Sequence, residues 1–214
     1  MTFKTFLALI PKISNLPLPG KQAQFVMAPM ERIKELKKTD IEAMKPRQAA
    51  VMALFYERDG ETYIILILRK TYKGVHSNQV GFPGGKVEEQ DKDLLATAMR
   101  ETYEEVGVAK KDMISIKKLT NIYIPPSNFW VQSFMGYVQS TPTFVAQEEE
   151  VETLIEVPLV ELLQAESVGT SRITTSYASN LEVPVFTLQG YNVWGATAMM
   201  LNEIKELLLQ AVKH

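Results

Sequence analysis

The chain has 214 residues, 46% of them hydrophobic, so it can bury a sizeable core, and its length fits one domain with a short extension. Its 23 basic and 25 acidic side chains give a net charge of −2, without the basic field that attracts nucleic acids. The absence of cysteine excludes disulfides, thiolate nucleophiles and cysteine-ligated zinc.

These features favour a cytoplasmic protein with neither a nucleic-acid nor a membrane partner. The first apolar run is short and is interrupted by Pro11, and no small-residue cleavage site follows it, so we expect no signal peptide. No apolar run is long enough to cross a membrane. A metal ion, if one binds, must use oxygen or imidazole ligands.

Residues 1–46 form the predicted extension. Residues 1–20 hold three prolines and predict an irregular arm, and residues 23–38 predict a helix interrupted near Pro29. We expect the arm and helix to pack on a domain that spans residues 47–214.

The domain begins with two runs rich in β-branched and aromatic residues, 47–57 and 61–70, and the turn residues Asp59 and Gly60 between them predict a β-hairpin. A glycine-rich loop then leads into an acidic helix that begins near Asp93. The later patterns predict strands at 114–124 and 128–138, a strand running into a helix at 151–165, and a last helix at 196–212. Strands interleaved with helices predict an α/β fold, in which a mixed sheet lies between helices.

The acidic helix carries three carboxylates on one face. Glu101, Glu104 and Glu105 stand at i, i+3 and i+4, within an arc of about 100°. The stripe expected on the opposite side, which can dock on a sheet, comprises Leu95, Met99, Thr102 and Val106, with Tyr103 beside it. Like charges at this spacing repel by roughly a few tenths of a kcal/mol per pair, so something must offset them.

A divalent cation offsets this repulsion well. Carboxylate oxygens are preferred ligands of Mg²⁺ and Mn²⁺, whose open positions hold water and take phosphates. Arg100 can pair with Glu104 or fix the rotamer of a carboxylate. A glutamate run alone would be read as a solvated face. The fixed frame of Gly85, Arg100, Gly107 and the three glutamates makes chance an inadequate account.

This frame resembles the signature of the Nudix hydrolases, Gly-x5-Glu-x7-Arg-Glu-U-x-Glu-Glu-x-Gly-U, where U is apolar. The matching residues are Gly85, Arg100, Glu101, Glu104, Glu105, Gly107 and Val108. Two features depart from the signature. Thr102 stands at an apolar position, and the segment between Gly85 and Arg100 is one residue longer than usual, so Asp91 and Asp93 are the acids nearest to the first glutamate.

The resemblance implies an α/β/α sandwich and an enzyme that uses Mg²⁺ or Mn²⁺ to hydrolyse a diphosphate linking a nucleoside to another group. The implied metal ligands are Glu101, Glu104 and Glu105. The implied catalytic residues within the signature are Glu104, Glu105 and Arg100. The backbone of Gly84 and Gly85 could approach metal and phosphate closely because neither residue has a Cβ, although a plain loop-to-helix turn would also use them.

The longer signature, the FPGG segment and the VWGATA segment at 193–198 resemble the coenzyme A pyrophosphatase branch of the family. Half of that branch's upstream motif is kept. Its retained positions are Leu66, Arg69 and Phe82–Gly85, and its changed positions are Ile67, Lys70, Gly74 and Asn78. Glycine at 74 removes an arginine that could bind phosphate in a bidentate manner. The likeness implies that Arg69 contacts substrate, whereas an arginine at a strand end is often a surface ion pair.

Residues 147–158 offer a further carboxylate outside the signature. By likeness to the branch, Glu150 is the expected general base or extra metal ligand. An exposed acidic turn containing Glu148, Glu149 and Glu150 is the alternative. His76 could touch phosphate, but a lone loop histidine is usually solvated.

Aromatic residues near Pro125 and Pro126 allow two interpretations. Phe129 and Trp130 could stack on a base, although a core or dimer-interface role is favoured. Trp194 is expected to be structural, at the start of the last helix.

The expected reaction releases 3′,5′-ADP and 4′-phosphopantetheine, or its acyl form, from coenzyme A or an acyl-CoA. ADP-ribose, a dinucleotide or a nucleotide sugar is the alternative substrate. A non-catalytic module that binds a nucleotide metabolite is the alternative of another class, and it would be expected to have lost the three glutamates. The expected partner is therefore a small nucleotide conjugate, and a homodimer is suggested only by analogy with the family.

Overall fold

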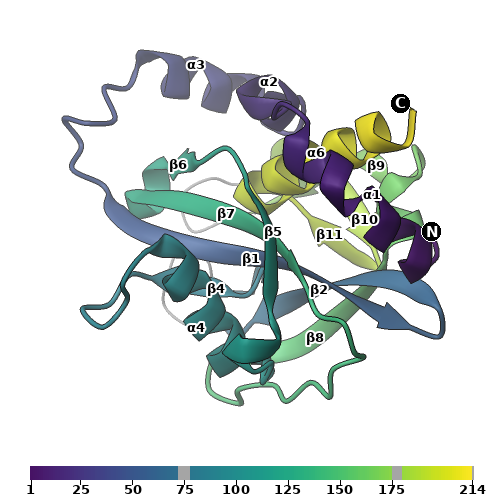
Figure 1. Ribbon diagram of the computed structural model, residues 1–214. Helices are drawn as coiled ribbons and strands as arrows, with labels where there is room; N and C mark the ends of the chain where they lie inside the picture. Colours follow the sequence, from purple (N-terminus) through teal and green to yellow (C-terminus); the bar gives the residue numbers. More distant parts are fainter. Residues whose placement is uncertain (72–77, 175–179, 214) are drawn as a thin grey trace.

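The computed structural model describes residues 1–71, 78–174 and 180–213 (Figure 1). Its helices are α1 (Phe3–Asn15), α2 (Gly20–Val26), α3 (Met30–Lys38), α4 (Leu94–Val106), α5 (Leu159–Leu163) and α6 (Gly195–Lys213), with 3-10 turns η1 (Lys110–Asp112) and η2 (Pro125–Ser127). Its strands are β1 (Arg47–Arg58), β2 (Glu61–Arg69), β3 (Val80–Gly81), β4 (Gly84–Lys86), β5 (Ile114–Lys118), β6 (Ile122–Ile124), β7 (Phe129–Tyr137), β8 (Val151–Pro158), β9 (Val168–Ile173), β10 (Leu181–Leu188) and β11 (Tyr191–Val193).

The main sheet is built around the predicted hairpin of β1 and β2. Asp59 and Gly60 form its turn with φ angles of 52° and 79°, which suit aspartate and glycine. The central order is β3-β2-β1-β7-β5, with β8 added on β2, β4 on β1 and β6 on β7. The sheet is mixed because β1 and β7 run parallel while the other pairs are antiparallel.

Helices cover both faces of this sheet, which confirms the predicted α/β/α sandwich (Figure 1). Alternate residues of β1 point to opposite faces. Met52 and Leu54 belong to the core under α4. Ala53 and Phe55 belong to the larger core that includes α1 and α6.

The prediction of an irregular arm at residues 1–20 was wrong, because most of this segment forms helix α1. Pro11 lies inside the helix, where it costs about 3 kcal/mol. Burial of Phe3, Phe6 and Ile13 offsets that cost, at about 1.5–3 kcal/mol per large side chain. The Phe6 ring lies 4.9 Å from that of Phe55, so tertiary packing overrides the local helix-breaking signal.

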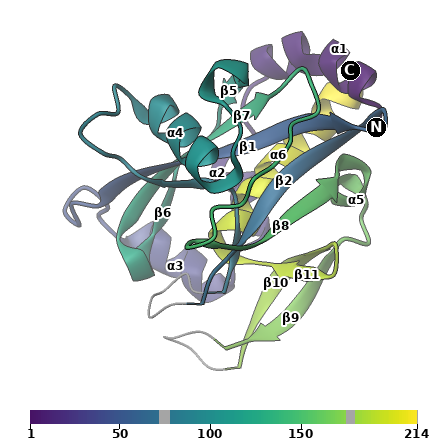
Figure 2. The same ribbon diagram turned by 90° about the horizontal axis from the view of Figure 1, so that it is seen from below.

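The other predicted elements are present, except that the single strand predicted at 114–124 is divided into β5 and β6 by residues 119–121. The helix break near Pro29 separates α2 from α3, β6 and β7 flank Pro125 and Pro126, and β8 runs into α5. Strands β9, β10 and β11 form a second sheet that the sequence patterns did not predict. Figure 2 shows this sheet at the edge of the molecule, away from α4. Within the described residues, no helix has the length and apolar character needed to cross a membrane.

Candidate active site

Helix α4 has well-defined ends. The Asp93 carboxylate accepts a hydrogen bond from the Ala96 amide at 2.7 Å and forms the N-cap. Gly107 ends the helix in the left-handed region, with φ 80°, and its amide donates to the Tyr103 carbonyl at 2.9 Å. These caps fix the helix that presents the three glutamates.

The three glutamates differ in burial. The side chain of Glu105 is 2% exposed and that of Glu101 is 12% exposed, whereas that of Glu104 is 49% exposed. The sequence predicted all three carboxylates on the side of α4 opposite its packed face. This prediction was wrong for Glu101 and Glu105, which border the packed face. Tyr103 is half exposed and does not join the packed stripe.

Thr102 is compatible with the apolar position that it occupies in the signature. It is fully buried against the sheet. Its hydroxyl donates to the Ala98 carbonyl at 2.6 Å, so the polar atom is satisfied within the helix.

Arg100 joins the glycine-rich loop to α4. Its guanidinium, 5% exposed, donates to both Asp91 carboxylate oxygens at 3.0 Å and to the Lys86 carbonyl at 2.9 Å. The same group contacts Glu101 at 3.0 Å and Glu104 at 2.8 Å. The predicted pairing with Glu104 is therefore present, as part of a larger network.

Asp91 and Asp93 have separate roles. Asp91 pairs with Arg100 while Asp93 caps α4, so Asp91 is the acid that anchors the longer loop. Hydrogen bonds from Arg100 lower the pKa of Asp91 from 3.8 to about 2. The same pairing raises the pKa of Arg100, which stays charged.

Glu105 lies at the junction of helix, loop and strand. It accepts a hydrogen bond from the Gly84 amide at 2.7 Å and pairs with Arg69 of β2 at 3.2 Å. Burial raises the pKa of Glu105 to about 7, against the opposing effects of Arg69 and of the Gly84 amide. Arg69 does form an ion pair, but the pair is part of the carboxylate cluster and Arg69 is only 26% exposed.

Close packing requires glycine at position 84, whereas a side chain at position 85 would displace the end of the Glu101 side chain. Gly84 has φ 155°, and a Cβ there would come within 2.6 Å of Val51 Cα. A Cβ on Gly85 would overlap the Glu101 carboxylate. The missing side chains let β4 pass directly over β1 and beside α4.

Glu150 is brought to the same place from a distant part of the chain. The amide of Gln147 donates to the Glu105 carbonyl at 3.1 Å, and the amide of Lys70 donates to the Glu150 carbonyl at 2.8 Å. A cavity of about 320 Å³ is lined by Glu88, Arg100, Glu101, Glu104, Glu105, Gln147 and Glu150. Neither Glu148 nor Glu149 lines it. The sequence had not indicated Glu88 or Gln147, which carry no spacing signal.

A second cavity of about 670 Å³ adjoins the first, and Glu88, Glu101 and Glu150 line both. Arg69, Gly84 and Gly85 line the larger cavity alone. Phe129 and Trp194 line this larger cavity. Phe129 also packs against the main hydrophobic core. Trp130 instead packs against Tyr123, with ring centroids 6.4 Å apart.

Asn78 adopts φ 55°, a conformation that asparagine tolerates better than most residues, which makes its replacement of glycine in the upstream motif conservative. Gly74 and His76, two other positions considered in the sequence, lie outside the described residues, as does His214.

The carboxylates suit a hard divalent ion by chemistry, since all of them offer oxygen donors. Among the described residues, no three acidic or histidine side chains already converge as a metal cage. The guanidinium of Arg100 lies against Glu101 and Glu104, and that of Arg69 lies against Glu105. Glu101 and Glu104 each contact Arg100 through one carboxylate oxygen, so the other oxygen of each could bind a metal ion while the arginine contact is kept. Both oxygens of Glu105 already accept hydrogen bonds, from Arg69 and from the Gly84 amide.

Comparisons with known proteins identify the family of the chain. Residues 46–176 match the NUDIX domain family. The chain is 31% identical over 166 residues to the human mitochondrial coenzyme A diphosphatase NUDT8, covering 77% of this chain and 70% of that protein. It is 32% identical over 173 residues to the uncharacterized Nudix hydrolase NudL of Enterobacter sp., covering 79% and 85% respectively.

Solved structures with the same fold include the Nudix hydrolase RenU from M. smegmatis, with a TM-score of 0.53, 13% identity and coverage of 77% of this chain and 87% of that one. A MutT/nudix family protein from Enterococcus faecalis gives a TM-score of 0.52 at 16% identity, covering 87% and 75% respectively. At these identities the likeness establishes the fold alone.

The fold and its relatives define a hydrolase of diphosphate linkages. The chain belongs to the Nudix family. Nudix hydrolases generally use divalent metal ions, which fits the oxygen-rich donor set of the cavity.

The Asp91–Arg100 pair predicts a pH-dependent stability. Because the pKa of Asp91 is lowered from 3.8 to about 2 on folding, the ionised pair contributes about 2 kcal/mol above pH 4, and this contribution is lost as the pH falls towards 2. Asp91→Asn should therefore lower the free energy of unfolding by at least about 2 kcal/mol at pH 7 and by less at pH 3. Urea unfolding at both pH values measures the difference.

Asp93→Asn is the matched control for that substitution. Asparagine caps helices about as well as aspartate, so this variant should stay within about 0.5 kcal/mol of the native protein at both pH values. An Asp91→Asn deficit that does not shrink at pH 3 would contradict the proposed linkage.

Proposed function

We propose that this protein hydrolyses the diphosphate of coenzyme A or an acyl-CoA with Mg²⁺ or Mn²⁺, giving 3′,5′-ADP and (acyl-)4′-phosphopantetheine. The observation that carries the proposal is the gathering of Glu101, Glu104, Glu105 and Glu150 around one cavity. The coenzyme A diphosphatase among the relatives and the position of Arg69 beside the cluster support the choice of substrate.

In this proposal Glu101, Glu104 and Glu105 hold the metal. A bound divalent ion would activate water and neutralise charge on the diphosphate. Arg100 keeps Glu101 and Glu104 oriented through its contacts with both, and Asp91 holds Arg100 in turn. Arg69 and the backbone of Gly84 and Gly85 face the larger cavity and are the proposed contacts to the diphosphate.

Glu150 is the proposed general base. Its charge raises the pKa of both Glu101 and Glu105, which indicates that its carboxylate is close to theirs. Glu150 would take a proton from the attacking water as the new oxygen–phosphorus bond forms. The bond from that phosphorus to the bridging oxygen breaks, and the departing phosphate takes the electron pair.

Changes in the coenzyme A motif keep a second substrate class in view. Gly74 and Asn78 replace an arginine and a glycine of that motif, and Ile67 and Lys70 replace a threonine and a small residue. ADP-ribose, a dinucleotide or a nucleotide sugar would require the same metal and base, so only the groups bound on either side of the diphosphate would differ. A non-catalytic binding module is disfavoured because the three glutamates are retained.

Product analysis tests the reaction directly. The purified protein is incubated with coenzyme A, an acyl-CoA, ADP-ribose, NADH or a nucleotide sugar, with and without Mg²⁺ or Mn²⁺, and the products are identified by mass spectrometry. We expect metal-dependent release of 3′,5′-ADP and 4′-phosphopantetheine. Cleavage of another conjugate alone would change the substrate and keep the chemistry, and no cleavage of any would favour a binding module.

Glu105→Gln should lower turnover by roughly 100-fold or more while the protein stays folded, because the amide keeps the shape of the side chain and removes its charge. Steady-state kinetics at saturating metal, together with circular dichroism, separate the two effects. Glu89→Gln, an exposed residue outside both cavities, is the matched control and should leave turnover unchanged. Turnover of Glu105→Gln close to that of the control would place the active site elsewhere.

Glu150→Gln should lower kcat by roughly 100-fold and remove the acidic limb of the pH–rate profile, because the amide cannot accept the proton of water. Glu148→Gln belongs to the same turn but does not line the cavity, and it should keep the native rate and profile. Equal effects of the two substitutions would assign the turn a structural role.

A further inference from the structure

The larger cavity has two chemically different ends. One end contains the carboxylate cluster with Arg69, Lys86 and the loop glycines. The other end is mainly apolar, and its walls include Leu36, Ile124, Phe129, Val183, Trp194 and Met199. A cavity of about 670 Å³ lies within the usual range for small-molecule sites.

Four of the six residues named for the apolar end lie outside the family match, whereas Ile124 and Phe129 lie within it. That match covers residues 46–176. Leu36 belongs to α3, which precedes the match. Val183 of β10, Trp194 just before α6, and Met199 of α6 follow it. The chemistry thus lies within the matched segment, and much of the apolar wall is specific to flanking segments.

Charge argues against a phosphate group at the apolar end. The charged residues of α3 that line the cavity are Glu31, Arg32 and Glu35. Arg32 already pairs with Glu35 at 2.7 Å, so the two acids outnumber the one base. Arg47 is absent from the lining, since it lies over the Phe129 ring at 4.2 Å and donates to the Ser127 carbonyl.

An uncharged chain suits this end better. Apolar side chains favour removal of a carbon chain from water. An anionic phosphate would lose hydration there, and among the described residues that line this end the one cation, Arg32, is already paired with Glu35. The two halves of coenzyme A differ in charge. The nucleotide carries a further phosphate, whereas the pantetheine arm carries none beyond the diphosphate, so the arm suits the apolar end better.

We propose that α3, β10 and the start of α6 form a subsite for the uncharged arm that the diphosphate links to the nucleotide, and that Leu36 is a specificity-determining residue. This inference rests on the proposed function. The arm is of the pantetheine or acyl-pantetheine kind, extending from the carboxylate cluster along Phe129 towards Trp194.

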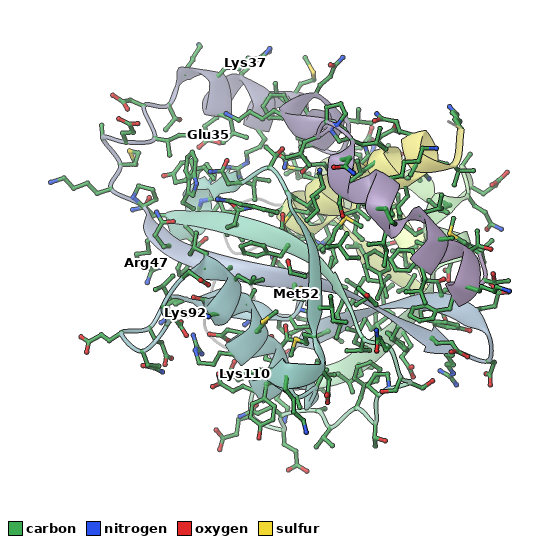
Figure 3. The ribbon with its side chains drawn as sticks, in the orientation of Figure 1. Glu35, Lys37, Arg47, Met52, Lys92 and Lys110 are labelled. Atoms are coloured by element: carbon green, nitrogen blue, oxygen red, sulfur yellow. The ribbon has the colours of Figure 1, made fainter. Side chains whose placement is uncertain are left out.

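The position of Leu36 allows a matched test on one helix. Figure 3 shows Glu35 on the side of α3 nearer the sheet and Lys37 on the outer side. Leu36 lines the cavity and packs on the core, whereas Lys37 is exposed and lines neither cavity. Leu36→Asn and Lys37→Asn therefore introduce the same side chain at a lining and a non-lining position.

The experiment compares two substrates that share the nucleotide and the diphosphate. One is octanoyl-CoA, and the other is the β-methyl ester of 3′-phospho-ADP, which has no arm. We expect Leu36→Asn to lower kcat/KM for octanoyl-CoA by roughly ten-fold or more and to change the value for the methyl ester by less than about two-fold. Lys37→Asn should change neither value.

A second variant addresses shape instead of polarity. Leu36→Trp fills the apolar end, so it should also reduce cleavage of octanoyl-CoA selectively. Equal losses on both substrates would indicate a structural role for Leu36, and native values on both would place the arm elsewhere. Either result would overturn the subsite.

The outcomes separate this inference from the proposed function. If the native protein cleaves coenzyme A while the Leu36 variants show no selectivity, only the subsite is wrong. If the native protein cleaves the methyl ester and no coenzyme A derivative, or cleaves neither, the proposed function fails and the subsite for this arm fails with it.

Discussion

A buried cation surrounded by carboxylates is the constraint on which the site depends. Arg100 is 4% exposed and is held by Asp91, Glu101, Glu104 and the Lys86 carbonyl, so it connects a loop to the helix that follows. Loss of one partner of a buried ion pair leaves the other charge uncompensated, at about 3–5 kcal/mol. The loop and the helix therefore cannot move apart cheaply, and the glycines that contact β1 are kept in place.

The network leaves acidic charge that the arginines do not fully offset. Glu105 has a hydrogen bond and an ion pair, yet burial still raises its pKa to about 7, and Glu101 shifts in the same direction. The charge of Glu150, which lines the same cavity, also raises the pKa of both groups. Burial and mutual repulsion make the ionised forms of these carboxylates unfavourable, and a bound cation would stabilise them. The arrangement that lowers the stability of the fold therefore favours metal binding.

Local patterns predicted the hairpin, the acidic helix and the shared face of Glu101, Glu104 and Glu105, because these follow from periods of two and 3.6 residues. Burial of Glu105 could not be predicted from the helix alone, since it depends on Gly84 and Arg69 from β4 and β2. The roles of Asp91 and Asp93 likewise depended on the path of the loop. Helix α1 forms through Pro11 because distant core contacts stabilise it.

The flanking segments are coupled to each other, and this coupling gives the proposed subsite a defined wall. Gln24 of α2 donates to Glu203 of α6 at 2.9 Å and to the Thr120 carbonyl at 3.0 Å, and Asn202 donates to the Ala23 carbonyl at 2.8 Å. Buried polar groups that satisfy one another hold a unique arrangement. Since α3 follows α2 after a short break at Pro29, its place over the cavity is tied to that of α6. If the proposed subsite holds, substitutions in α3 and α6 would alter the apolar end without touching Arg100 and the glutamates, which would separate the choice of substrate from its hydrolysis.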